Sequence, residues 1–376
     1  MTGVTASRPV SARLGKLHSK LRRKPHNTTG RYATGVLWAA LGIGLAITVV
    51  VSLGSGQFVI APDALWQSAA RHFGFAPPAE IGSSAALTDA ALWQVRVPRL
   101  LLGLLVGAAL GIAGALAQSL FGNPLAEPGV IGITAGASLG AALSIGLGIS
   151  WFGLVTTPVF AFAFGLATAF TVWLVARQIT AQRSLSLLLV GIAINAIAGA
   201  ATAFIFVVSS STARDAVVFW QLGSVNGATW NAVIQTAIPL AVATVAMLPL
   251  LRKLDLLALG DRAAGHLGCN VRRLRVALMI GIALITGAAV SFAGIIGFVG
   301  LVVPHALRLM VGPAHRRLVP LSMVGGALLI AVADLLARTL IYGVDLPIGM
   351  MTSLIGAPVF LVLLRQTFSQ RTGGAA

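Results

Sequence analysis

Few residues in this chain have side chains that could do chemistry, and they are scattered through long apolar stretches. Asp334 and Arg338 are four residues apart, so on a helix they would share one face and could form an ion pair. A carboxylate inside an apolar segment could instead relay protons in an ion-coupled transporter, but such relays need Glu or His partners at mid-depth. We therefore expect an intrahelical pair near the end of a membrane span.

Other candidate polar groups also favour structural roles. His305 follows Pro304 and could be a ligand for iron or haem, but a lone histidine in a packed bundle is more often a hydrogen-bonded structural residue. Cys269 is the single cysteine, which excludes an internal disulfide and a cysteine-cluster metal site. Gln118 and Asn195 are expected to bond between helices, although either could face a pathway. We expect no metal site and no cofactor.

Enzymatic machinery is not evident in the sequence. The Gly15-Lys16 pair in the N-terminal tail lacks the preceding glycine loop of a Walker A motif. The nine acidic residues do not form a plausible catalytic set. The sequence therefore predicts no catalytic residue and no nucleotide site, so an energy source would lie in another protein.

The elements that hold these groups are predicted to be membrane spans. Hydrophobic residues make up 57% of the 376 residues and charged residues 9%, which is too apolar for a water-soluble globule. A span needs about 20 mostly apolar residues. The sequence predicts an all-α integral membrane protein with ten transmembrane helices, at residues 35–55, 98–119, 129–148, 158–176, 185–208, 232–251, 276–293, 296–311, 318–337 and 349–366.

The basic residues predict the orientation of this bundle. In the ten-span arrangement 21 of the 26 Lys and Arg lie on one side and five on the other, which places both termini in the cytoplasm. Residues 1–34 would form a basic tail, residues 35–368 the ten-helix domain and residues 369–376 a second tail. The net charge of +17 fits attraction to anionic lipid, and nothing supports nucleic-acid binding. Residues 56–95 form the longest outer loop and could carry a short surface helix.

The stretch from Arg96 to Ala142 predicts a helical hairpin. Pro98 suits the first turn of a helix, and Asn123-Pro124 marks a tight turn before the next one. Glycines recur every four residues on each helix, which predicts close backbone approach, with the lining of a substrate path as the alternative. These glycines are Gly103, Gly107, Gly111, Gly132, Gly136 and Gly140.

A charged segment lies between two of the apolar stretches. Residues 252–275 hold six basic residues and are predicted to form a short cytoplasmic helix-turn-helix broken at Gly260. Such an element against a bilayer suggests a docking surface, although an ordinary cytoplasmic loop would have a similar composition.

The order of residues in that segment resembles a known coupling loop. Permeases of the iron-siderophore, haem and cobalamin ABC importer family contact their ATPase through such a loop. The residues that carry the resemblance are Leu259, Gly260, Asp261, Arg262, Ala263, Leu267 and Gly268. The hairpin of residues 96–142 also resembles the second and third spans of that family. Further matches follow in order at residues 219–224, 294–305, 333–338, 346–349 and 355–358.

The resemblance implies partners and a cargo. The chain would be the transmembrane subunit of an ABC importer in the plasma membrane, working with ABC ATPase subunits, an extracytoplasmic substrate-binding protein and a second permease subunit, identical or homologous. The implied cargo is a metal chelate, with ferric siderophore first and haem or cobalamin as alternatives. Arg96, Arg99 and Arg338 would receive acidic residues of the binding protein, unless they only mark span ends by snorkelling.

Two other classes of membrane protein stay open on the sequence alone. An ion-coupled secondary transporter would need coupling-ion sites near mid-membrane, commonly at broken helices. Here the charges lie at the borders of the spans instead. A receptor or scaffold without transport is also compatible with the composition.

Overall fold

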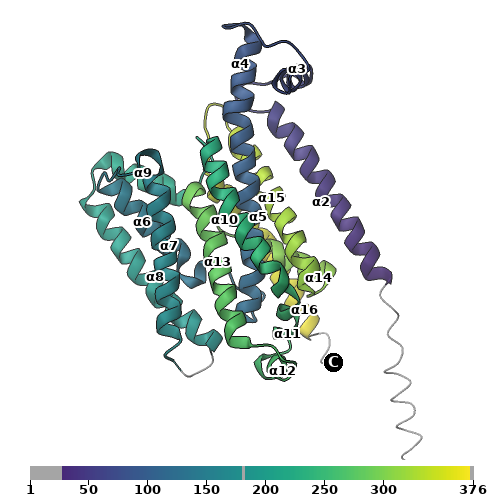
Figure 1. Ribbon diagram of the computed structural model, residues 1–376, viewed down its shortest axis with the longest axis vertical. Helices are drawn as coiled ribbons and strands as arrows, with labels where there is room; N and C mark the ends of the chain where they lie inside the picture. Colours follow the sequence, from purple (N-terminus) through teal and green to yellow (C-terminus); the bar gives the residue numbers. More distant parts are fainter. Residues whose placement is uncertain (1–27, 180–182, 373–376) are drawn as a thin grey trace, which may run out of the picture.

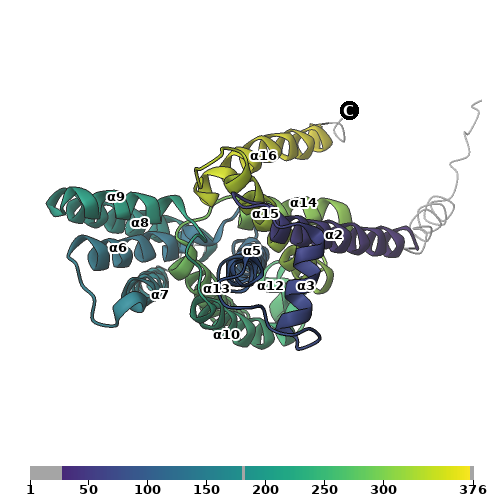
Figure 2. The same ribbon diagram turned by 90° about the horizontal axis from the view of Figure 1, so that it is seen from above.

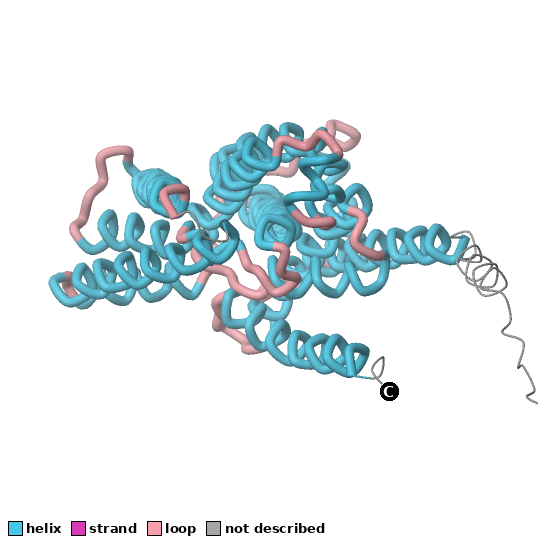
Figure 3. Tube along the Cα trace, turned by 90° about the horizontal axis from the view of Figure 1, so that it is seen from below, coloured by secondary structure: helices cyan, strands magenta, loops and turns pink. Residues whose placement is uncertain are grey.

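The computed structural model describes residues 28–179 and 183–372, and these residues form helices with no strand (Figures 1 and 3). The prediction of an all-α membrane protein is confirmed. The predicted tails lie outside the described residues up to residue 27 and from residue 373. The helices at the ten predicted spans are α2 (Thr28–Gly54), α5 (Val97–Phe121), α6 (Ile133–Gly146), α7 (Thr156–Ala176), α8 (Arg183–Val208), α10 (Trp230–Met247), α13 (Val271–Ala293), α14 (Val299–Val311), α15 (His315–Thr339) and α16 (Ile348–Thr372).

Two of these helices are shorter than their predicted spans. Eight described helices are long and apolar enough to cross a membrane, whereas α6 has 14 residues and α14 has 13. At 1.5 Å per residue, α6 extends about 21 Å, less than a hydrocarbon core of about 30 Å. The backbone is left-handed at Gly132 (φ 91°) and Phe298 (φ 68°), directly before the two helices. Each helix therefore begins after the predicted start of its span. Irregular backbone at this depth is tolerated where protein buries it.

Helix α5 is the centre of the bundle, with α10, α13, α14 and α15 around it (Figure 2). Glycines let α5 and α15 cross at close range. A Cβ atom added at Gly107 would lie 2.2 Å from the carbonyl oxygen of Gly326, and one at Gly111 would lie 2.0 Å from that of Ser322. Any larger side chain would push the two backbones apart, so these glycines fix the packing of α5.

Helices α6, α7 and α8 pack together at one side of α5, with α9 (Ser211–Leu222) beside them (Figure 1). Gly136 and Gly140 of α6 approach the carbonyl oxygens of Phe164 and Phe160 on α7, at 2.5 and 2.3 Å from an added Cβ. Gly103, by contrast, would meet only Ile330 at an ordinary 3.5 Å and Val225 at 4.0 Å. The glycine repeat therefore serves helix packing at some positions and is dispensable at others.

One end of the molecule, which carries α3 (Pro62–His72) and α4 (Ser84–Ala90), extends beyond the bundle (Figure 1). Helix α4, the π-helical turn η1 (Ala91–Arg96) and α5 follow one another without a break over 38 residues, and α3 packs against α4. The predicted outer loop thus holds two short helices instead of one. Arg71 on α3 pairs with Asp89 on α4 at 2.7 Å, and this hydrogen-bonded partner raises the pKa of Arg71.

Candidate functional site: coupling helices, outer arginines and inner cavity

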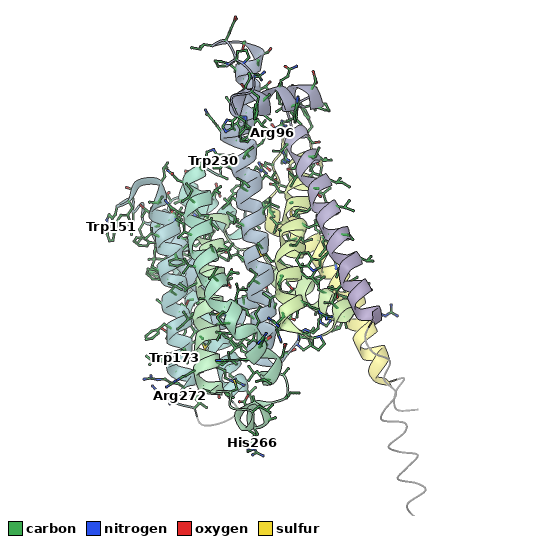
Figure 4. All side chains as sticks on the ribbon, turned by 45° about the vertical axis from the view of Figure 1, so that its right-hand side comes forward. Arg96, Trp151, Trp173, Trp230, His266 and Arg272 are labelled. Carbon is green, nitrogen blue, oxygen red and sulfur yellow. The ribbon has the colours of Figure 1, made fainter. Side chains whose placement is uncertain are left out.

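The charged segment forms two short helices at the opposite end of the bundle, as predicted. They are α11 (Leu251–Leu257) and α12 (Asp261–His266), and Figure 4 shows His266 at the lower tip. The turn between them places Gly260 at φ 98°, a left-handed conformation that L side chains rarely adopt. The break in the helix is therefore fixed by this glycine.

Most of the predicted coupling residues lie on the surface. Leu259 and Leu267 are 64% and 59% exposed, and Gly260, Asp261, Arg262 and Gly268 are exposed beside them. Ala263 is half-buried. Two leucines this exposed, beside the charged residues Asp261 and Arg262, form a surface suited to contact with another protein.

The inner face of the helix pair is anchored to the bundle. Leu254 and Ala264 are fully buried in the main hydrophobic core. Asp261 accepts a hydrogen bond from Arg275 at the start of α13, at 2.9 Å. The element is therefore held in position from both of its helices.

A polar chain that the sequence analysis missed joins α11 to two core helices. Asp255 on α11 accepts bonds from the backbone N–H and the Nδ1 of His315, at 2.9 and 2.7 Å, and so caps the start of α15. The Nε2 of His315 contacts Ser119 on α5. Asp255 was visible as an acid inside a basic segment, but its partner 60 residues away was not.

Two of the three arginines predicted to receive the binding protein are buried in ion pairs within the chain. Arg99 and Arg338 are only 9% exposed, and Arg99 donates to Asp334 at 2.9 Å and to Asp345 at 2.6 Å. Arg338 pairs with Asp334 at 3.5 Å, as expected from their spacing, and donates to the carbonyl oxygen of Ser55 at 2.7 Å. Both guanidinium groups are therefore paired within the chain, because they neutralise the buried Asp334, and Arg99 also neutralises the partly buried Asp345.

Arg96 is the most accessible of the three arginines. It ends the π-helical turn η1, is partly exposed and donates to the carbonyl oxygens of Leu53 and Phe58. Arg96 and Arg338 both approach Gly56, at 3.3 and 3.4 Å from an added Cβ. The network thus ties the end of α2 to α5 and α15.

A cavity of about 450 Å³ lies among α6, α8 and α9. Its polar lining comes from uncharged side chains, including Thr134, Ser138, Asn195 and Gln221. Asn195 donates to the carbonyl oxygen of Gly129 at 3.3 Å, while its buried Oδ1 has no partner among the described residues. The residue therefore both bonds between segments and faces an open space.

Gln118 and His305 are two further polar residues in the spans. The structure agrees with the prediction for Gln118 and corrects the one for His305. Gln118 bonds between helices as expected, donating to Leu301 at 3.2 Å and accepting from Arg308 at 3.1 Å. His305 is 2% exposed, but neither ring nitrogen has a hydrogen-bond partner in the described chain. The expectation of a hydrogen-bonded histidine was wrong. Among the described residues no three His, Cys, Asp or Glu gather as they would around a metal ion.

Glu127, in the connection between α5 and α6, is a further acid that the sequence analysis did not single out. Its carboxylate accepts a bond from the backbone N–H of Phe298, the residue with left-handed backbone before α14. Burial raises the pKa of Glu127 above its ordinary value, and the bond from Phe298 opposes that rise. This acid therefore links the two irregular connections next to α6 and α14.

Comparison with known proteins gives the family of this architecture. The FecCD transport family matches residues 44–366, which include the coupling helices and the outer arginines. The chain belongs to the FecCD transport family of ABC importer permeases. This FecCD-family permease is 36% identical to the hemin transport system permease protein HmuU of Yersinia pestis, over 89% of its length and 97% of the relative's.

Other relatives differ in the cargo named for them. The FecCD-family permease is 37% identical to the vitamin B12 import system permease protein BtuC of Vibrio cholerae, over 86% of its length and 92% of that protein's. It is 40% identical to the Fe(3+) dicitrate transport system permease protein FecD of Escherichia coli, over 73% and 84%. A solved metal-chelate type ABC transporter in an inward-facing conformation matches with a TM-score of 0.77 and 30% identity, over 88% of this chain and 99% of that one.

Proposed function

We propose that this chain is the permease subunit of an ATP-driven importer that carries a metal chelate inward across the plasma membrane. The observation that carries the proposal is the pair α11 and α12, whose exposed Leu259 and Leu267 stand at one end of an apolar bundle. Exposed leucines beyond the membrane spans mark a contact with another protein. The proposed orientation places this end and both termini in the cytoplasm, as the basic residues predict.

The proposed partner at this surface is an ABC ATPase. The sequence has no Walker A motif of its own, so ATP would be hydrolysed in two such subunits. Movement of the ATPases would act on α12 through its exposed residues. The Asp255–His315–Ser119 chain would carry that movement to α15 and α5.

A second permease subunit, identical or homologous, is proposed to cover α8 and α16. These helices expose large apolar side chains, such as Ile197 and Phe204 (64% and 65%) on α8 and Leu354 and Leu361 (63% and 60%) on α16. The polar cavity beside Asn195 adjoins the same part of the molecule. A translocation pathway between two copies would thus be lined by uncharged polar groups from each copy.

The outer end is proposed to receive a substrate-binding protein. Arg96 is the arginine suited to contact acidic residues of that partner, because it is partly exposed. Arg99 and Arg338 would hold the helix ends beside Arg96 in position through their ion pairs with Asp334 and Asp345. Asp334 lies in two ion pairs, which argues against a proton relay and so against an ion-coupled transporter.

The proposed cargo is a ferric siderophore, with haem and cobalamin as alternatives. Relatives of similar identity are named for hemin, vitamin B12 and ferric dicitrate transport, so the three chelates share one architecture. The uncharged lining of the cavity suits bulky chelates that carry their own metal ligands.

Transport in reconstituted vesicles tests the proposal. The permease would be inserted with and without its ATPase and binding protein, and supplied with labelled ferric siderophore, haem or cobalamin. Uptake that needs both partners and ATP, and that prefers the siderophore, is expected. Uptake by the permease alone along an ion gradient would establish a secondary transporter. Binding of a chelate without uptake would establish a receptor.

A further inference from the structure

An apolar groove runs along the side of the bundle between α7 and α13. It has a volume of about 290 Å³, and its lining includes Leu166, Phe170, Ile280 and Leu284. Phe170 and Ile280 are 59% and 55% exposed, so the groove is open to the surroundings of the bundle. Both helices are candidate membrane spans. The surroundings of this groove are therefore lipid acyl chains.

The lower end of the groove opens into a basic mouth. A second cavity of about 250 Å³ shares Trp173, Val276 and Met279 with the groove, so the two spaces are adjacent. All charged side chains that line this mouth in the described part of the chain are arginines: Arg177, Arg272 and Arg275. Figure 4 shows Trp173 and Arg272 together at the end that carries α12.

Trp173 and Arg177 have the arrangement of a membrane-interface anchor. The guanidinium of Arg177 lies 4.9 Å from the centre of the Trp173 ring. Tryptophan concentrates at the level of lipid headgroups, where its ring is half in an apolar and half in a polar environment. The mouth is therefore at headgroup depth, and the groove, which extends from it toward the middle of the membrane, is at acyl-chain depth.

The length of the groove matches one leaflet. Eleven residues separate Leu166 from Arg177 on α7, and twelve separate Arg272 from Leu284 on α13. At 1.5 Å per residue these distances are about 16 and 18 Å, close to half of a hydrocarbon core of about 30 Å. An acyl chain whose headgroup lay at the arginines would end near the middle of the membrane.

We propose that this groove binds one anionic phospholipid, with its phosphate between Arg177 and Arg272 and one acyl chain along Phe170 and Ile280. Charge complementarity selects an anionic over a zwitterionic headgroup, because basic pockets between spans attract negative lipids. The groove lies on α7 and α13, away from the exposed α16 (Figure 2). The residues proposed to hold the lipid lie on α7 and α13 and at their ends, not on α8 or α16, so the existence of the site does not rest on the proposed function.

The site lies directly beside the coupling helices. Arg275 lines the mouth and also bonds to Asp261, the first residue of α12. Arg272 is three residues earlier on the same helical face. A bound headgroup would therefore rest against the turn of α13 that positions α12.

Quenching of Trp173 fluorescence by brominated lipids tests the proposal. The full chain would be placed in nanodiscs that contain a small fraction of brominated phosphatidylglycerol or brominated phosphatidylcholine in a neutral, unlabelled lipid. The Trp173 signal is the difference between the wild-type chain and a Trp173→Phe variant. Each arginine near an anionic headgroup contributes about a fivefold preference, so the two give about a 25-fold preference for phosphatidylglycerol at low salt.

The Arg177→Gln/Arg272→Gln variant should lose this preference while its size-exclusion profile stays unchanged, since both side chains are exposed. Arg316→Gln/Arg317→Gln is the matched control, because it removes two exposed arginines near α11 and away from the groove. This control should keep the preference. Raising salt to about 1 M, where the screening length is about 3 Å, should abolish it in the wild type. Equal quenching by both lipids at low salt, or an equal loss in the control variant, would overturn the proposal.

Discussion

The buried position of Arg99 leads to a quantitative prediction about stability. Arg99→Gln would remove a guanidinium that lies 2.8 Å from Asp334 and 2.6 Å from Asp345, whose side chains are 4% and 21% exposed. Removing one partner of a buried ion pair costs about 3–5 kcal/mol, because the remaining charge is left uncompensated. The unfolding equilibrium should therefore shift by roughly two to four powers of ten.

Reversible unfolding of the purified chain in detergent would measure this shift. Arg96→Gln is the control, since Arg96 donates to backbone carbonyl oxygens and leaves no carboxylate unpaired when it is removed. Adding Asp345→Asn to Arg99→Gln should recover part of the lost stability, because it removes the carboxylate that has lost its partner while Asp334 keeps Arg338. A variant Arg99→Gln that unfolds like the wild type but no longer binds the substrate-binding protein would refute the structural role and restore direct docking.

Three further predictions concern the coupling turn, the helix crossing and the buried acid. Gly260→Val should leave the protein inserted but abolish ATPase pull-down, because valine is strained at φ 98°; normal ATPase association would contradict the coupling role. Gly111→Leu should unfold at a much lower temperature than Gly103→Ala, which has room for its methyl group, and equal melting temperatures would argue against the close α5–α15 crossing. The raised pKa of Glu127 means that its stabilising contribution is complete below its unfolded value near 4.5 and is lost as pH rises through the folded value. Glu127→Gln should thus flatten this pH dependence of the melting temperature, and an unchanged slope would assign it to another group.

The helices could be predicted because their signals are local. A long apolar run between charges indicates a span wherever its partners lie. Gly260 likewise marks the start of α12 through its own backbone conformation. The shorter α6 and α14 could not be predicted from hydropathy. Their late starts depend on Phe298 and Gly132, whose connections are buried by other helices.

The ion pairs of Arg99 could not be predicted from the sequence, because its partners are far away along the chain. Arg99 meets Asp334 and Asp345 across 235 and 246 residues. From the sequence alone, an arginine at a span end could face solvent or neutralise a buried acid. The spacing of Asp334 and Arg338 predicted their pair but not the third member.

The continuous helix of residues 84–121 connects the end of the molecule that carries α3 to the end that carries α11 and α12. Its 38 residues measure about 57 Å, nearly twice the thickness of a hydrocarbon core. Near one end of this helix the backbone carbonyl oxygen of Trp93 accepts a hydrogen bond from the indole N–H of Trp230, and near the other end Ser119 contacts His315. In the proposed orientation, a displacement at one membrane surface would be transmitted to the other along this single helix, and η1, the irregular turn within it, is where the helix would bend.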